Sequence, residues 1–109
     1  MYISITGIKV KSFIGMLKFI RYSVPSFTAA RKANGNLFCD AKKINGYHHT
    51  LTAWENKSKM IDYLKGKHHA LAMKNFRSIG TGSVHGYEDK ILPNWDDAIK
   101  KWKENFKEI

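Results

Sequence analysis

Hydrophobic and polar positions alternate most regularly in the middle of the chain. From Tyr47 to Trp54 the apolar or aromatic character changes with a period of two, which is typical of a β-strand whose side chains point to opposite faces. Asn45-Gly46 comes directly before this segment, and that dipeptide favours the positive φ angles of a type I′ turn. The pattern therefore predicts a β-hairpin with arms at 36–44 and 47–54.

The first ten residues show a second alternating segment. Ile3 and Ile5 share one parity, Gly7 interrupts, and Ile8 and Val10 continue with the other parity. An extra residue in one strand would shift the parity in this way. The sequence predicts a strand with a bulge near Gly7.

A helical period follows Ser12, a residue that favours the helix N-cap. Apolar side chains recur at i, i+3, i+4, i+7 and i+11, which predicts a helix with one apolar face: Phe13, Met16, Leu17, Ile20 and Val24. Pro25 is expected to stop or kink this helix, because proline lacks the backbone N–H. A further turn or two would then end at Asn34-Gly35.

The second half of the chain contains two further helical regions and one strand. Apolar helical stripes lie on both sides of Gly66: Met60, Tyr63 and Leu64 before it, and His69, Ala72, Met73 and Phe76 after it. Gly80 and Gly82 predict a turn into a strand over 83–88. Asn94 is a good N-cap for a last helix, whose buried stripe is predicted as Trp95, Ala98, Ile99, Trp102 and Phe106.

This order of elements is strand, helix, strand, strand, helix, strand, with an added C-terminal helix. It predicts an α+β fold, namely a ferredoxin-like split βαβ arrangement with an antiparallel sheet, formed as a single domain over 1–109. Helices would cover one face of the sheet. The other face also carries large side chains, and we expect a second subunit's sheet to cover it, which gives a homodimer of the dimeric α+β-barrel type.

Composition narrows the classes of protein. The formal net charge of +10 could attract polyanions, but the lysines are spread over every element, which is typical of a solvated basic surface, and a nucleic-acid partner is not expected. The single cysteine, Cys39, cannot form an internal disulfide and fits an inert thiol in a reducing, cytoplasmic setting. No segment approaches the roughly 20 apolar residues of a membrane span.

Three motifs together resemble a known superfamily. They are Tyr47-His48-His49-Thr50-Leu51-Thr52-Ala53-Trp54-Glu55 with Met60 following, His69-Ala70-Leu71-Ala72-Met73, and Gly86-Tyr87-Glu88 leading to Leu92-Pro93-Asn94-Trp95. The chain resembles the dimeric α+β-barrel superfamily that includes the antibiotic-biosynthesis monooxygenases, and within it a bacterial family related to spheroidene monooxygenase. The resemblance extends over nearly the whole chain.

The resemblance implies a monooxygenase-like protein that binds a small hydrophobic or aromatic molecule in the cavity between sheet and helices. The expected catalytic residues are His69 and Trp54. Further ligand-binding residues are expected at five positions: His49, Leu51, Met73, His85 and Tyr87. In a cofactor-free oxygenase, His69, His49 or His85 would act as the base toward an electron-rich substrate, because an imidazole pKa near ~6.5 suits neutral pH.

No cofactor is expected, and haem is the alternative. The resemblance to haem-degrading members implies that His69 would be the axial ligand and that Trp54 would line the porphyrin cavity. Those enzymes carry an Asn on the first strand, where this chain has Ser4 and Thr6. A protein-ligated metal site is not predicted, because neighbouring histidines such as His48 and His49 point to opposite faces of a strand.

Two other interpretations of the sequence are a structural role for these side chains and a non-catalytic binding protein. His69 can be a structural histidine whose ring bonds a backbone carbonyl, and Trp54 and Tyr87 can simply pack between sheet and helix. The protein can also be a non-catalytic dimer that binds a hydrophobic ligand, or a basic protein that binds nucleic acid, in which case the affinity would fall steeply with salt.

Overall fold

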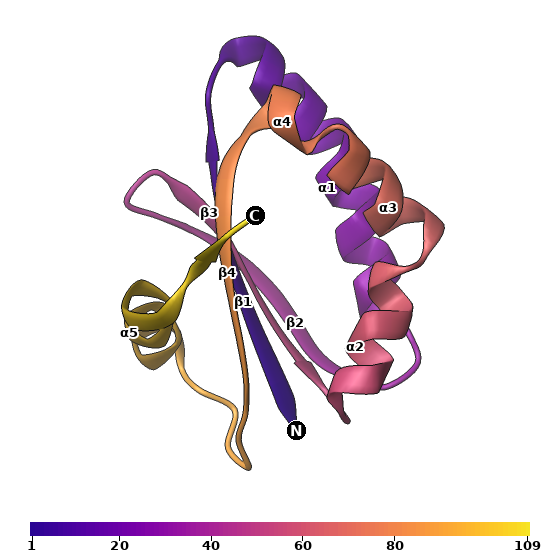
Figure 1. Cartoon of the computed structure of the whole chain (residues 1–109), viewed down its shortest axis with the longest axis vertical. Coiled ribbons are helices and arrows are strands. Elements are labelled where there is room, and N and C mark those ends of the chain that lie inside the picture. The colour runs from indigo at the N-terminus through magenta and orange to yellow at the C-terminus, as the bar shows by residue number, and fades with distance from the viewer.

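The computed structural model describes all 109 residues as one five-stranded antiparallel sheet with helices on both faces. The strand order is β2-β3-β1-β4-β5. Figure 1 shows α1 to α4 on one side of the sheet and α5 on the other. The elements are β1 (Tyr2–Val10), α1 (Phe13–Lys32), β2 (Asn36–Ile44), β3 (Tyr47–Trp54), α2 (Lys57–Leu64), α3 (Lys67–Lys74), α4 (Phe76–Ile79), β4 (Gly80–Glu88), α5 (Trp95–Asn105) and β5 (Lys107–Glu108).

The central strand β1 is regular throughout, so the predicted bulge near Gly7 is wrong. Gly7 pairs with His49 of β3 and with Ser83 of β4 without any slip in register. A Cβ atom at Gly7 would lie 2.5 Å from the Trp102 ring. Because glycine has no side chain, the Trp102 indole of α5 can pack against the sheet at this position. The change of parity at Ile8 means that the apolar side chains after Gly7 lie on the opposite face of the strand. The register shift of the sheet lies in β2, between Asn36 and Phe38.

Helix α1 begins as predicted and ends at Lys32, just before the predicted end at Asn34-Gly35. Ser12 caps it, with its hydroxyl accepting a hydrogen bond from the Gly15 amide at 3.0 Å. The helix was predicted to stop or kink at Pro25, and the stop is wrong because the helix continues to Lys32. Proline removes one N–H hydrogen bond from a helix. The segment after it is held by tertiary packing instead, since Ser26 and Ala30 are both buried.

The hairpin and the last helix agree with the sequence pattern, except that Phe106, predicted in the buried stripe, lies beyond α5 and is 46% exposed. Asn45 and Gly46 have φ angles of 51° and 82°, as a type I′ turn requires. Asn94 caps α5 by accepting a hydrogen bond from the Asp97 amide at 2.8 Å. Strand β4 starts earlier than predicted, because Gly80 and Gly82 pair with β1 at Val10 and Ile8 and are not in a turn.

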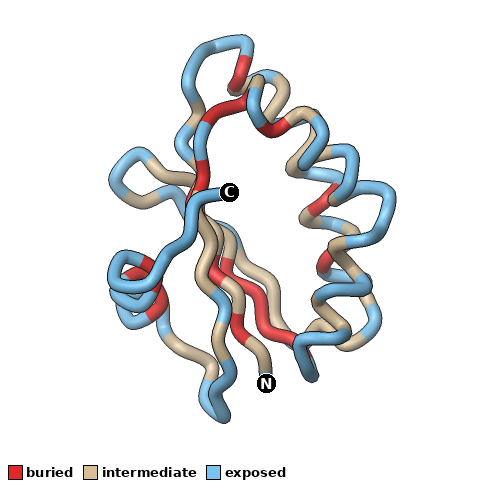
Figure 2. Tube along the Cα trace, in the orientation of Figure 1, coloured by how far each residue is buried: buried red, intermediate tan, exposed pale blue.

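The most tightly packed core lies between the sheet and α5. Its members are at most 5% exposed: Ile3, Ile5, Leu51, Ala53, Ala98 and Trp102. Figure 2 shows these buried stretches in the central strands and in α5. The second sheet face is thus covered by α5 of the same chain, and the need for a partner's sheet, on which we based the homodimer, does not hold. The homodimer itself stays a prediction. None of the helices is both long and apolar enough to cross a membrane.

Candidate functional site

A cavity of about 1160 Å³ lies between the sheet and the helical layer formed by α1 to α4. This volume slightly exceeds the range of typical small-molecule sites, which is about 300–1,000 Å³. Its lining comes from both layers and is mixed apolar and polar. The residues that line it include Ser4, Thr6, Phe19, Ser26, Phe27, His48, Thr50, Thr52, Trp54, Tyr63, His69, Ala72, Met73 and Phe76.

The sheet supplies a polar floor. Directly paired residues of an antiparallel sheet point to the same face. Ser4 is paired with Thr52, and Thr6 with Thr50, so four hydroxyl-bearing side chains lie together in the middle of the cavity. Apolar side chains of the helices face them, including Phe27 of α1. A bound molecule would meet hydroxyl groups on one side and hydrocarbon on the other.

An aromatic wall closes one end of the cavity. The ring of Trp54, which is 1% exposed, stacks on Tyr63 with centroids 5.3 Å apart. Tyr63 in turn meets the edge of the His69 ring at 5.4 Å. The Trp54 indole N–H donates to the Thr52 hydroxyl at 3.0 Å, which fixes the plane of the indole. Strand β3, α2 and α3 each provide one ring, and their contacts set the position of His69.

The aromatic wall is anchored to α1 by Tyr63. Its hydroxyl donates to the backbone carbonyl of Ser26 at 2.8 Å and lies 2.7 Å from the Ser26 hydroxyl. Ser26 is 8% exposed. Burial also raises the pKa of Tyr63, partly offset by the hydrogen bond to Ser26, so the hydroxyl is protonated at neutral pH. Tyr63 therefore ties α2 to α1 across the cavity.

His69 is half-buried and is the residue of the aromatic wall that can act as a base at neutral pH. Desolvation by burial lowers the pKa of His69, and a backbone hydrogen bond to Leu64 partly opposes that effect. The ring is therefore mainly neutral at pH 7. A neutral imidazole has one nitrogen that carries no proton, so His69 can accept a proton there. The interpretation of His69 as a structural histidine whose ring bonds a backbone carbonyl stays a prediction.

The structure divides the predicted site residues between the two faces of the sheet. Trp54, His69 and Met73 line the cavity. Leu51 belongs to the core beneath α5, so the expectation that it contacts a ligand together with Trp54 is not met. Tyr87 packs against the same core. The reason is the pleat, since residues 51 and 54 of one strand point to opposite faces.

His49 and His85 also have their rings on the α5 face, although β3 and β4 border the cavity at these positions. His49 is 2% exposed and meets the edge of the Trp102 ring at 4.7 Å, and its Nδ1 lies 3.2 Å from the Thr6 carbonyl oxygen. His85 stacks on Tyr87 at 5.4 Å. Neither imidazole is placed to act as a base in the cavity.

His48 lines the cavity, although it is not among the predicted site residues. Its ring contacts Phe19 of α1, with centroids 4.5 Å apart, and desolvation with a contribution from Lys43 lowers its pKa. Six residues separate it from Trp54, which corresponds to about 20 Å along a strand. His48 and His69 therefore mark opposite ends of the cavity. The alternation of 48, 50, 52 and 54 was the signal that could have identified His48.

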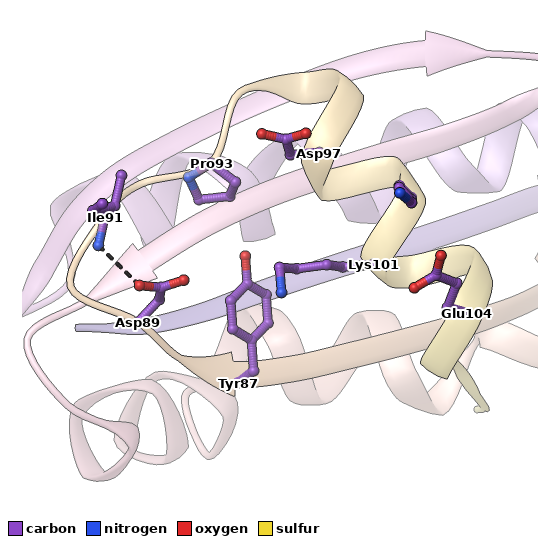
Figure 3. Close-up of a pocket in the computed structure, with 8 residues that line it drawn as sticks. Tyr87, Asp89, Ile91, Pro93, Asp97, Lys101 and Glu104 are labelled. Atoms are coloured by element: carbon purple, nitrogen blue, oxygen red, sulfur yellow. Dashed lines mark hydrogen bonds between the residues drawn. The ribbon is translucent and has the colours of Figure 1, made fainter.

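A smaller pocket of about 400 Å³ lies on the other side of the sheet, between α5 and the segment after β4 (Figure 3). Lys101 lies over the Tyr87 ring at 4.7 Å from its centroid, and Asp89, Asp97 and Glu104 surround them. The Tyr87 hydroxyl is buried without a hydrogen-bond partner, and burial followed by Asp89 and Asp97 raises its pKa. Opposite charges dominate this pocket and only two of its lining residues are hydrophobic. An apolar ligand fits the larger cavity better.

The remaining reactive side chains do not add to the site. Burial raises the pKa of the Cys39 thiol to about 11, partly offset by Arg31, so a nucleophilic thiolate is scarce at neutral pH. No group of three or more His, Cys, Asp or Glu side chains is arranged to hold a metal ion. The polar side chains that line the cavity include the floor hydroxyls and the imidazoles of His48 and His69, and four lysines and an asparagine also border it: Lys42, Lys43, Lys57, Lys107 and Asn105.

Solved structures with this architecture are numerous. A protein from Deinococcus radiodurans assigned to the antibiotic biosynthesis monooxygenases superposes with a TM-score of 0.72 at 18% identity, covering 86% of this chain and 97% of the other. Rv0793 from Mycobacterium tuberculosis gives 0.73 at 8% identity, covering 86% and 100%. SnoaB, a cofactor-independent oxygenase from Streptomyces nogalater, gives 0.67 at 9% identity, covering 85% and 97%.

These similarities confirm the predicted α+β, ferredoxin-like fold and its likeness to solved structures of antibiotic biosynthesis monooxygenases. No protein-family model matches the sequence, and no curated protein matches it either. At identities of 8–18% the superpositions show the fold alone. Function has to be argued from the cavity.

Proposed function

We propose that this protein is a cofactor-free oxygenase that binds a small aromatic molecule in the cavity between the sheet and α1 to α4, with His69 as the base. The observation that carries the proposal is the position of His69, a half-buried imidazole that packs against Tyr63 at the wall of a large, partly apolar cavity. The fold shared with a cofactor-independent oxygenase supports the same assignment.

The proposed reaction uses the substrate as its own reductant. His69 takes a proton from an activated CH₂ group next to an aromatic ketone or phenol, and the resulting carbanion gives electrons to O₂. One oxygen atom then enters the substrate as a carbonyl oxygen, while the second leaves as water together with both hydrogens of the CH₂ group. A positioned imidazole contributes about 10²–10⁴-fold to such a proton transfer.

The rest of the cavity would bind and orient the substrate. The aromatic wall of Trp54 and Tyr63 offers a flat surface on which an aromatic ring can stack. The hydroxyl groups of Thr6, Thr50 and neighbouring floor residues can donate to or accept from ketone and phenol oxygens. Met73 on α3 is an adaptable apolar contact at the edge.

The test uses anthrone, an aromatic ketone with one activated CH₂ group, and measures oxygen consumption and product absorbance. His69→Gln should lower kcat by about 10²–10⁴-fold with little change in KM, because the amide cannot accept the proton. His68→Gln is the matched control, since His68 is the exposed neighbour on the same helix and should retain wild-type turnover. Equal turnover by wild type and His69→Gln would refute the role of His69.

A haemin titration separates this proposal from a haem-dependent one. The free nitrogen of His69 that would accept the proton is also the atom that would bind iron, so both roles disappear in His69→Gln. The cofactor-free proposal expects no saturable Soret shift that depends on His69. A shift saturating at one haem per chain and lost in His69→Gln would replace the proposal with a haem protein. If anthrone quenches the tryptophan fluorescence but is not turned over, the protein binds the ligand without catalysing its oxidation.

A further inference from the structure

The outer side of α1 carries an apolar row that is largely exposed to solvent. Phe13, Leu17, Ile20 and Val24 follow the i, i+4, i+7, i+11 spacing of one helix face. They are 78%, 54%, 53% and 57% exposed. The sequence pattern marks this row as a buried face, yet the structure leaves it in solvent.

The packing of α1 explains why the row remains outside. The side chains of α1 that are buried or face the cavity are a different set, namely Phe19, Ser23, Ser26, Phe27 and Ala30. At 100° per residue, this set is centred roughly 110° around the helix from the apolar row. Only Val24 reaches the border of the cavity. Figure 2 shows exposed residues along the outer side of the helical layer.

The helical layer is strongly basic, and Asp62 of α2 is its one acidic residue. The first carboxylate in the chain is Asp40, and α1, α3 and α4 contain no Asp or Glu. Cations are present on or beside the same helices: Lys11, Lys18, Arg21, Arg31, Lys32, Lys67, Lys74 and Arg77. Lys11 donates to the carbonyl oxygen of Arg77 at 2.9 Å, which places a lysine and an arginine together near the start of α1. Six of the nine acidic residues lie instead within 88–109.

We infer that this side of α1 docks on an anionic lipid surface, with the apolar row entering the headgroup region and the neighbouring cations facing lipid phosphates. Exposed aliphatic and aromatic side chains combined with Lys and Arg are the features that such surfaces recognise. A nucleic acid would use the cations but gain nothing from Leu17 and Ile20. A second copy docked on the same row would bring Arg21 of both copies close together, and α1 has no carboxylate to pair with them.

The experiment is vesicle flotation of the full chain with phosphatidylcholine alone and with phosphatidylcholine containing phosphatidylglycerol. Two variants perturb the surface, Leu17→Ser with Ile20→Ser, and Lys18→Glu with Arg21→Glu. Lys18 is only partly buried and the other three residues are exposed, so the fold should persist, which circular dichroism verifies. The matched controls are Ile91→Ser, at a residue 74% exposed near α5, and Lys90→Glu beside it.

The proposal expects binding to the anionic vesicles only, a loss of about tenfold or more in each perturbed variant, and no change in the controls. Absence of binding to anionic vesicles overturns it. Binding that survives Leu17→Ser with Ile20→Ser also overturns it, because the attraction would then be purely electrostatic. Sedimentation showing a dimer that this variant dissociates would assign the row to a second copy instead. Anthrone turnover by the variants is read separately, so failure of the docking surface and failure of the oxygenase are distinguishable.

Discussion

Replacing Tyr63 by Phe removes one oxygen atom and tests whether the aromatic wall depends on its anchor to α1. The tyrosine hydroxyl is bonded to the carbonyl oxygen of Ser26 at 2.8 Å and lies 2.7 Å from the Ser26 hydroxyl. A buried polar group that loses its partner costs about 1–3 kcal/mol. The Ser26 hydroxyl can recover part of this by bonding a carbonyl in the preceding turn of α1. We therefore expect Tyr63→Phe to lower the free energy of unfolding by about 1–2 kcal/mol.

The assay is urea unfolding followed by tryptophan fluorescence, with Tyr47→Phe as the control. Tyr47 is also partly buried, but its hydroxyl makes no hydrogen bond, so its removal should change the free energy of unfolding by less than about 0.5 kcal/mol. Ser26→Ala combined with Tyr63→Phe removes both side-chain hydroxyls and leaves the Ser26 carbonyl, and it should cost less than the sum of the single changes. If Tyr63→Phe is no more destabilising than Tyr47→Phe, the anchor does not exist as described.

Two further predictions concern stability. Gly7→Ala should destabilise the protein by about 1–3 kcal/mol, because the new methyl group would lie 2.5 Å from the Trp102 ring. Thermal unfolding should show a smaller penalty in a Trp102→Phe background. An unchanged Tm would contradict the close contact. Burial lowers the pKa of His48, His49, His69 and His85, so the unfolded chain binds more protons once the pH falls below about 6.5. Stability should therefore decrease as the pH falls through that value, and a flat dependence between about pH 7.5 and pH 5.5 would show that these rings are not desolvated.

The strands and helix caps could be predicted because each depends on a local pattern. The Asn45-Gly46 turn, the Ser12 cap and the Asn94 cap all occur as predicted. The errors at Gly7 and Pro25 have a different origin. In both cases a residue with a strong local preference is overruled by contacts with distant elements, Trp102 for Gly7 and the packing of Ser26 for Pro25.

The site was predicted in part, for a similar reason. His69 and Trp54 were selected and both lie at the cavity. The prediction that His49 and Leu51 share a site with Trp54 is inconsistent with the alternation of β3, which places His48 on the same face as Trp54. The Tyr63–Ser26 contact joins residues 37 positions apart, and no spacing in the sequence indicates it. The parity of a strand identifies which residues share a face, but partners across layers become visible only in the fold.

The packing of α5 has a consequence for how the chain reaches its native state. Gly7 in β1 and Trp102 in α5 are in contact although about 95 residues separate them along the chain. Closing such a long loop is entropically costly, and contacts of this separation slow folding. Until α5 docks, Ile3 and Ile5 lack the cover that Ala98 and Trp102 provide. During that interval the apolar strand face can associate with other chains, so folding yield should depend on protein concentration more strongly than the stability of the finished domain would indicate.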